Sequence, residues 1–486
     1  MPRVASLSAL LLAVSCAPIE DVREQEIVDV VVRADEPLLR ARPALVASKY
    51  RAMQGSLFSF YRGTFPLYLH DTAAGHVGDA SSFDVKVFPF TIGDAHPENF
   101  GTLLAADGTL GFEPNDFDGA DRYPYLWDVR RLAIGLVVGA RDSNPDDPDA
   151  RKVARASEHD YAQAAALGYA EEIHRLARGG ARERFTAPTS AFLIDLFKRA
   201  NKDLASRDEL AGLTVMTNGR RRLLRGVLDE ADPENTTESV SDTVATALPG
   251  TLGAYRQTLP VALPKAFFEL KDAAREYGSG VASRPRVRIL LLVEGPTTSL
   301  DDDVILELKE IADSGAPPVA EPSVSADDVG GRIRHALESC WTTRSAEPLW
   351  GTSTLLGLPV QIRAEREAHK TVRVARMKEE LGTPEAITDL ATELGQTLAR
   401  IHAGSEASLP GTISAIDLAI GDDRAAFADE QTAVALEYAD VVEGDYARFR
   451  DALDTLGPTL GFRNDTTDAP DADLAALYGT PPEVTP

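Results

Sequence analysis

Residues 92–101 read IGDAHPENFG and residues 114–118 read PNDFD. The segment that joins them carries two short apolar runs on either side of Asp107-Gly108, a dipeptide that strongly favours the turn of a hairpin. We therefore expect strands over 100–104 and 110–112, joined by this turn. Such a hairpin brings the two quoted segments side by side.

The two segments contain the groups that phosphoryl transfer needs. The acceptor hydroxyl requires a group that takes its proton, and the phosphates require Mg²⁺ held by hard oxygen ligands. Asp94 is the candidate catalytic base, with His96 in the same loop, and Asn99 and Asp116 are candidate metal ligands. In the competing interpretation each of these residues caps a loop or stabilises a turn, as Asp and Asn commonly do. Their occurrence together in one short window favours a functional site.

The order G-D-x-H-x-x-N, then a strand pair, then N-D-F-D resembles the catalytic and metal-binding loops of aminoglycoside-phosphotransferase-type kinases. The chain is still more similar to the bacterial domain-of-unknown-function family 2252. That family's pattern recurs in MQGSLFSFYRG at 53–63, in WDVRRLA at 127–133, in GQTLARIHA at 395–403, and around Tyr438 and Asp445. The resemblance covers about residues 42–453, which is most of the chain.

The resemblance implies a role for each matching residue. Asp94 becomes the catalytic base, and Asn99 and Asp116 become the metal ligands. Asp128 becomes a buried acid that braces the catalytic loop. The spacing from Asn99 to Asp116 is a few residues longer than in kinases, so Asp118 is an alternative second metal ligand. The sequence leaves the choice between Asp116 and Asp118 open.

A kinase also needs a glycine-rich strand pair that covers the nucleotide and a strand lysine that contacts its phosphates. Here the candidates follow the catalytic loop instead of preceding it. Gly278 and Gly280 form the candidate glycine turn before a buried strand, and Lys309 ends the next strand. Glu338, on the helix that follows, is the candidate ion-pair partner of Lys309.

These parts predict an α+β, two-lobed, protein-kinase-like fold in which the chain is circularly permuted. Joining the region after His402 to the region before Gly93 recovers the ordinary kinase order, and permutation is tolerated where chain ends lie close together at the surface. We expect strands over 287–293, 304–309 and 359–363, and helices over 150–177, 187–205, 330–341 and 387–403.

The glycine turn departs from the kinase pattern. Small residues are expected where Ala282, Arg284 and Pro285 stand, and proline has no N–H to offer a phosphate. Arg284 or Arg286 is a candidate for contacting phosphate oxygens through its guanidinium instead. The competing interpretation of Lys309 is a surface lysine at a sheet edge.

The first residues have the features of an export signal. Arg3 precedes an apolar run over 4–14 that is too short to span a bilayer, and Cys16 follows small residues as in a bacterial lipobox. This predicts a lipoprotein of the cell envelope, anchored to the membrane surface through lipidated Cys16. A plain signal peptide and a misassigned start are the alternatives.

Export conflicts with the use of ATP, because ATP is a cytosolic donor. The sequence therefore supports two functions. The first is transfer of a phosphoryl group from ATP or another nucleotide, with Mg²⁺, to a small hydroxylated acceptor. The second is a catalytically inactive kinase-like lipoprotein that binds a ligand or a partner.

Composition and motifs exclude several other classes. A formal charge of −26 argues against nucleic-acid binding, which rewards basic surfaces. Two cysteines and eight histidines show no metal-ligand spacing, and no G-x-S-x-G motif of a serine hydrolase occurs. The clustered arginines at 220–222, beside an Asn-Gly hairpin turn, suit either an anionic substrate or a solvated turn.

The chain divides into six predicted regions. They are a signal peptide at 1–16, a polar tether at 17–36, the catalytic-loop region and helical lobe at 37–270, the small lobe at 271–375, a helical part of the large lobe at 376–463, and a disordered acidic tail at 464–486.

Overall fold

The computed structural model describes residues 22–78, 81–142, 148–311, 315, 329–365, 367–378, 382–463 and 467–478. The predicted signal peptide and its Cys16 lie outside these residues. Among the helices within them, none combines the length and the apolar character that a membrane crossing requires.

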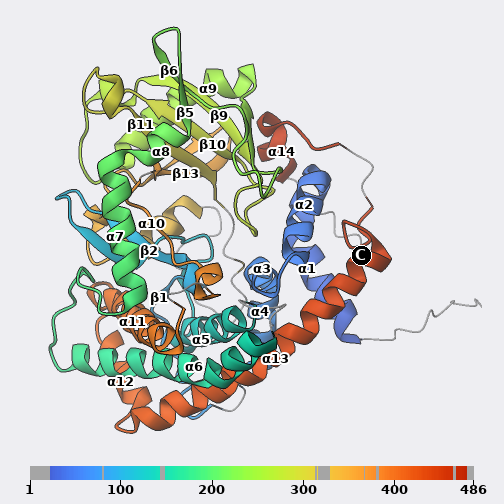
Figure 1. Cartoon of the computed structure of the whole chain (residues 1–486), viewed down its shortest axis with the longest axis vertical. Coiled ribbons are helices and arrows are strands. Elements are labelled where there is room, and N and C mark those ends of the chain that lie inside the picture. The colour runs from blue at the N-terminus through green and yellow to red at the C-terminus, as the bar shows by residue number, and fades with distance from the viewer. Residues whose placement is uncertain are drawn as a thin grey trace, which may run out of the picture.

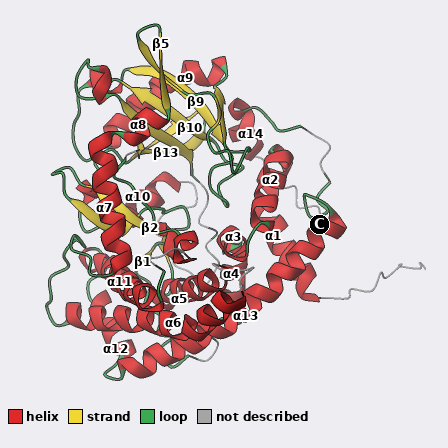
Figure 2. Ribbon diagram, in the orientation of Figure 1, coloured by secondary structure: helices red, strands yellow, loops and turns green. Residues whose placement is uncertain are grey.

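Seven antiparallel strands form the sheet at the top of Figure 1, in the order β12-β13-β11-β10-β9-β8-β7. Their bounds are β7 Gly226–Val227, β8 Thr236–Ser239, β9 Leu270–Tyr277, β10 Arg288–Val293, β11 Val304–Glu310, β12 Gly351–Leu355 and β13 Leu358–Glu365. The predicted strands over 287–293, 304–309 and 359–363 are confirmed as β10, β11 and β13. Figure 2 shows most of the strands gathered at this end of the molecule and most of the helices at the other.

Strand β10 is apolar from Ile289 to Val293, as expected of a strand with both faces of its sheet covered. Ile289 and Leu291 belong to a core that includes helix α9 (Asp242–Tyr255). Leu290 and Leu292 point to the opposite face, where they join residues of helix α8 (Asp208–Gly212) and the β5–β6 hairpin. The sheet lobe thus includes β7, β8 and α9, so the predicted start of the small lobe at residue 271 falls inside it.

The second lobe is built from helices packed around one large apolar core. They are α3 Leu57–Gly63, α4 Phe65–Ala73, α5 Tyr125–Asp142, α6 Pro148–Ala177, α11 Pro384–Ala403, α12 Thr412–Ile420 and α13 Arg424–Leu456. Helices α7 (Ala191–Ser206) and α10 (Val329–Cys340) complete the predicted set, and all four predicted helices are confirmed.

Helix α11 lies directly against α6 because two glycines leave no side chain between them. A Cβ on Gly395 would lie 2.0 Å from the carbonyl oxygen of Ala165, and one on Gly168 would lie 2.6 Å from that of Thr392. This close approach fixes the helix that ends at His402 against the core of the lobe.

Three two-stranded sheets lie outside the seven-stranded sheet. They are β1–β4 (Phe90–Thr91, Asp121–Arg122), β2–β3 (Phe100–Leu104, Leu110–Pro114) and β5–β6 (Thr214–Thr217, Arg220–Leu223). The predicted hairpin around Asp107-Gly108 is confirmed as β2–β3, and Gly108 has a φ of +82° as such a turn requires. The Asn-Gly hairpin is confirmed as β5–β6.

The predicted polar tether does not hold from Val22 on. Residues Val22–Ala41 form helix α1, which packs against α4 and α13 and buries Ile27, Val28 and Val31. The apolar residues recur at helical spacing among many charged ones, so the mean polarity of the stretch concealed an amphipathic helix. Helix α2 (Pro43–Gln54) follows at once.

The predicted disordered tail is wrong for the part described. After a 3₁₀ turn at Asp471–Asp473, residues Leu474–Tyr478 form α14, and Leu474 is fully buried. Asp471 pairs with Arg42 and with Arg275, both of which are buried. These long-range contacts order a segment whose composition resembles that of disordered chains.

Candidate active site

Asp94 follows strand β1 in a loop that is held from both sides. The carboxylate of Asp128, fully buried on α5, accepts the backbone N–H groups of Ile92 and Gly93, each at 3.0 Å. His402 Nε2 lies 3.3 Å from the same carboxylate. Gly93 has a φ of +74°, and a Cβ there would lie 2.1 Å from the Gly119 carbonyl oxygen. Asp128 therefore makes the contacts expected of an acid that braces this loop.

The Asp94 carboxylate lies in a nearly closed environment. Arg131 Nε donates to it at 2.8 Å, and the Arg131 guanidinium stacks 3.6 Å from the ring centre of Tyr61. Burial raises the pKa of Asp94 above its ordinary value, and the charge of Arg131 opposes this rise. A carboxylate with a raised pKa is better suited to take a proton than an exposed one.

His96 and Asn99 lie beside Asp94. His96 Nε2 is 3.5 Å from the Asp94 carboxylate, and burial holds the pKa of His96 well below its ordinary value, so the ring is neutral. The Asn99 side-chain nitrogen donates to the Asp94 carbonyl at 2.7 Å. Its oxygen is then the atom that remains for a ligand.

The hairpin brings the PNDFD segment back to this loop. Strand pairing sets Phe100 opposite Pro114, and the Asn115 N–H donates to the Asn99 carbonyl at 3.0 Å. Asp116 and Asp118 follow directly, and the Asp118 N–H donates to the Asp116 carboxylate at 3.0 Å.

Lys309, on β11, closes the site from the sheet lobe. Its Nζ lies 3.3 Å from Asp116 Oδ2 and 2.6 Å from Asp118 Oδ2, and Gln361 of β13 donates to the other Asp118 oxygen at 2.9 Å. Although burial raises it, the pKa of Asp116 lies below its ordinary value because of Lys309. Although burial lowers it, the pKa of Lys309 is raised by Asp116 and Asp118. Lys309 is buried, which excludes the surface-lysine interpretation.

The structure does not bring Glu338 to Lys309. Glu338 is half-exposed on α10 and lies 3.4 Å from Arg344, so the predicted Lys309–Glu338 pair is wrong. Lys309 pairs instead with Asp116 and Asp118, in the loop after β3. The order of elements in kinases suggested a partner on helix α10, whereas the tertiary structure places the acidic loop next to Lys309.

Gly278 and Gly280 lie in the connection between β9 and β10, with φ values of +76° and +75°. Both line the same cleft as Asp94 and Asp116. Neither of the two arginines predicted as phosphate contacts is unpaired. Arg284 pairs with Asp232 and Glu234, and Arg286 pairs with Glu310.

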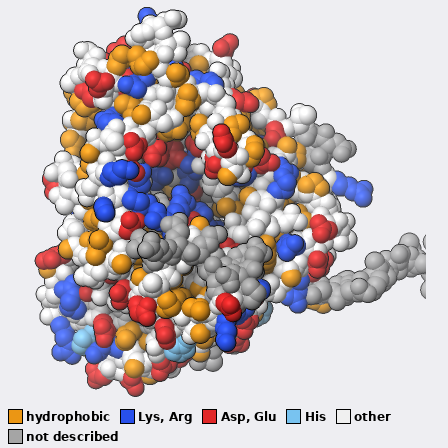
Figure 3. Space-filling view, viewed as in Figure 1, with side chains coloured by type: hydrophobic (Ala, Val, Ile, Leu, Met, Phe, Trp, Pro, Cys, Tyr) orange, Lys and Arg blue, Asp and Glu red, His pale blue; other side chains and the backbone are white. Residues whose placement is uncertain are grey.

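The cleft between the sheet and the helices has a volume of about 1410 Å³. Figure 3 shows it as a hollow near the middle of this face, with Lys and Arg side chains gathered at its edge. Among its lining residues are Arg62, Glu98, Arg363 and Arg373, which the sequence prediction did not single out. Arg62 and Glu98 lie inside sequence motifs that were recognised, so membership of those motifs was the available signal.

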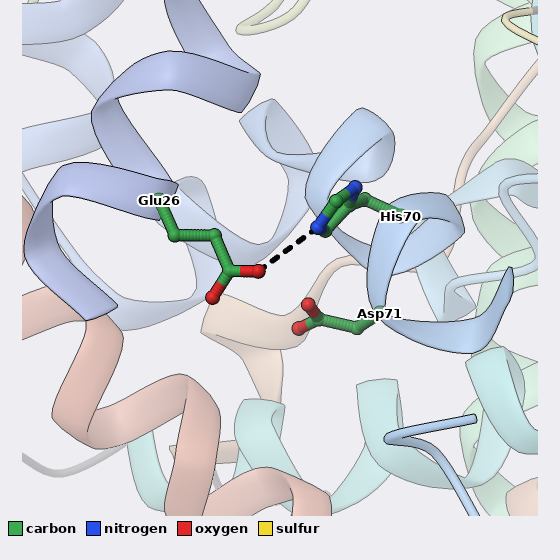
Figure 4. Close-up of side chains that lie close together, drawn as sticks. All are labelled: Glu26, His70 and Asp71. Atoms are coloured by element: carbon green, nitrogen blue, oxygen red, sulfur yellow. Dashed lines mark hydrogen bonds and ion pairs between the residues drawn. The ribbon is translucent and has the colours of Figure 1, made fainter. Parts of the chain in front are cut away.

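A second group of possible metal ligands lies outside the cleft centre. Figure 4 shows Glu26 of α1 pointing toward His70 of α4, at 3.0 Å, with Asp71 beside them. Arg23 donates to Glu26 and to Asp71, and Tyr438 also donates to Asp71. These carboxylates are neutralised by an arginine, which makes the group a structural ion-pair network.

Comparison with known proteins adds the family. The model of a family described as "Uncharacterized protein conserved in bacteria (DUF2252)" matches residues 40–452. The chain belongs to the DUF2252 family. No curated protein and no solved structure matches the chain significantly. The match spans the sheet, most of the helical lobe and every residue of the candidate site.

Proposed function

We propose that this DUF2252 protein is a Mg²⁺-dependent phosphotransferase with a permuted kinase-like fold, which moves a phosphoryl group from a nucleotide to a small hydroxylated acceptor. The observation that carries the proposal is the buried Lys309 on a sheet strand, paired with Asp116 and Asp118 across the cleft. A cation from one lobe facing acids from the other is the arrangement that holds nucleotide phosphates and their metal.

Three features support the fold assignment. The glycine connection, the lysine strand and helix α10 occur in kinase order, although after the catalytic loop. His402, in the last turn of helix α11, lies next to Asp128, which holds the Asp94 loop. Helix α1 packs against α13 and α14, so the two ends of the described chain lie together, as a permuted chain requires.

The donor set suits Mg²⁺. Asp116, Asp118 and the side-chain oxygen of Asn99 are hard oxygen ligands that line one cleft. When bound, the ion would neutralise charge on the transferred phosphate. The chain's own residues would do the rest. Asp94 would take the proton of the acceptor hydroxyl as the bond from that oxygen to the transferred phosphorus forms and the bond from phosphorus to the bridging oxygen of the nucleotide breaks, which releases the nucleotide shortened by one phosphate. Lys309 would leave its carboxylates to contact the donor phosphates.

An inactive, ligand-binding protein is the second candidate. It is favoured by the glycine connection, where Arg284 is held by Asp232 and Glu234 and Pro285 offers no N–H to a phosphate. Such a protein would bind a ligand in the cleft and transfer nothing.

Calorimetric titration of the protein with ATP, with and without Mg²⁺, tests the proposal. We expect Mg²⁺-dependent binding that Asp116→Asn and Lys309→Ala each weaken at least about tenfold, because each removes a charge-assisted contact. Asp107→Asn, in the exposed turn of the same hairpin, is the matched control and should bind as the parent does.

The titration also separates the alternatives. Loss of metal dependence in Asp118→Asn alone would move the metal ligand from Asp116 to Asp118. Binding of ATP and Mg²⁺ without phosphoryl transfer to any of a panel of small hydroxylated acceptors would favour the inactive protein. If the folded protein, shown to be intact by a normal melting curve, binds no ATP either with or without Mg²⁺, the proposal is wrong.

A further inference from the structure

Two arginines share one carboxylate in the wall of the cleft next to Asp94. Arg62, from α3, lies 2.7 Å from Glu98 Oε2, and Arg373 lies 3.4 Å from the same oxygen. The other Glu98 oxygen accepts the Val374 N–H at 2.8 Å. Two guanidiniums therefore share one carboxylate oxygen, in a protein whose overall charge is strongly negative.

These residues border the candidate base. Arg62, Glu98, Arg373, Asp94 and His96 all line the cleft. Burial raises the pKa of Asp94, and the charge of Arg62 opposes this rise. Burial lowers the pKa of His96, and the charges of Arg62 and Arg373 lower it further. The two arginines therefore lie close to the place where an acceptor hydroxyl would meet Asp94.

Part of this wall has unused hydrogen-bonding groups. Arg62 Nε and His96 Nδ1 are buried without a hydrogen-bond partner among the described residues. Arg373 is 57% exposed, so its guanidinium is open to a ligand. The Arg62 side chain is 23% exposed, so part of it also faces the cleft.

A second pair of arginines shares a carboxylate on the sheet side of the cleft. Arg288 and Arg363 both pair with Glu307. These two arginines lie on strands of the sheet, whereas Arg62 and Arg373 are tied to Glu98 in the loop that carries Asp94. Arg62 and Arg373 are therefore the pair placed to meet an acceptor beside Asp94.

We propose that Arg62 and Arg373 bind an anionic group of the acceptor, a carboxylate or a phosphate, next to the hydroxyl presented to Asp94. This proposal rests on the proposed phosphotransfer and names its acceptor class: a small hydroxylated anion. Guanidinium groups bind carboxylates and phosphates through paired, charge-assisted hydrogen bonds. Glu98 holds the two arginines in place while the anion is absent.

Calorimetry with three probes tests the acceptor site: inorganic phosphate, glycerate and uncharged glycerol. We expect phosphate or glycerate to bind and glycerol not to bind. Phosphate alone would indicate a phosphorylated acceptor, and glycerate a carboxylated one. Arg373→Gln should weaken anion binding about tenfold, since it removes one charge-assisted contact. Arg151→Gln changes an exposed arginine of α6 that does not line the cleft; it is the control and should leave anion binding unchanged.

A second variant tests whether weaker anion binding in Arg373→Gln merely reflects misfolding. Glu98→Gln removes the competing charge but keeps an oxygen for the Val374 N–H, so anion binding should tighten about threefold or more. A purely structural role of the two arginines predicts no such gain.

The outcomes separate this proposal from the proposed function. Nucleotide binding without any phosphate or glycerate binding would overturn the acceptor class and leave phosphotransfer standing. Anion binding that Arg373→Gln and Arg151→Gln weaken equally would be general electrostatic attraction and would also overturn it. Loss of nucleotide binding with retained, Arg373-dependent anion binding would remove the phosphotransfer while keeping the anion site.

Discussion

Glu365 illustrates how one side chain in the sheet lobe responds to its surroundings. It ends β13, opposite Ile305 of β11, near the carboxylate of Glu307. Burial and the charge of Glu307 raise the pKa of Glu365 to about 8. Glu307 itself stays ionised because Arg288 and Arg363 hold it. These two acids on neighbouring strands therefore differ in charge at neutral pH: Glu365 is protonated and neutral, whereas Glu307 is ionised.

This difference predicts a pH dependence of stability. The folded protein keeps a proton on Glu365 that the unfolded chain releases near pH 4.5, so this contribution to stability is complete below pH 4.5 and is lost as pH rises through about 8. Glu365→Gln should abolish that loss, a gain of about 1–2 kcal/mol at pH 9 after allowing for partial exposure. Urea unfolding at pH 5, 7 and 9 measures it. Exposed Glu230→Gln serves as control, and equal slopes in both variants would contradict the assignment.

The connection between β9 and β10 shows what an element requires of its residues. Gly278 has a φ of +76°, and a Cβ there would lie 2.3 Å from the Glu234 carbonyl oxygen. Gly108, in the β2–β3 turn, also has a positive φ but has nothing within 4 Å of a Cβ. Gly278 is required both by its backbone conformation and by the lack of space for a side chain, whereas Gly108 is required by its backbone conformation alone.

The two glycines therefore form a matched pair for substitution. Gly108→Ala should lower the free energy of unfolding by about 1 kcal/mol, the usual cost of a left-handed alanine. Gly278→Ala should cost more, about 3 kcal/mol, because the Glu234 backbone must also move. It should also weaken nucleotide binding, since this connection lines the cleft. Chemical denaturation of both variants measures the two losses of unfolding free energy. Similar losses would mean that the Glu234 backbone moves away from the new Cβ at little cost.

At the scale of the whole molecule, the last described segment ties the lobes together. Asp471 pairs with Arg42, at the start of α2, and with Arg275 of β9. Arg42 also donates to the Pro285 carbonyl in the glycine connection. In Figure 1 this segment, with α14, lies between the sheet and α2. The chain end thus stabilises both walls of the cleft at once.

Removing this tie should destabilise the protein strongly. Asp471→Ala leaves two buried guanidiniums without their carboxylate, and we expect a loss of about 3 kcal/mol in unfolding free energy. Asp473→Ala, exposed in the same 3₁₀ turn, should change little. Thermal unfolding of both variants measures the difference. Equal melting temperatures would show that the segment does not hold the lobes.

The local elements followed from residue pattern alone. The β2–β3 hairpin, strands β10, β11 and β13, and the helix ending at His402 each carry their signal within a few residues, as a turn dipeptide or an apolar period. Family membership also followed from short motifs. The convergence of Asp94, Asn99 and Asp116 could be expected because one hairpin connects them.

Long-range partners were decided by the tertiary structure. The partners of Lys309, the packing of α1 and the ordering of residues 467–478 depend on contacts between segments that are far apart in the chain. Composition averages over a stretch, so it described both chain ends as polar and missed the few buried residues that fix them. The sharing of Glu98 by Arg62 and Arg373 was hidden for the same reason: charge balance in a cleft is set by which side chains meet in space, and sequence spacing does not record it.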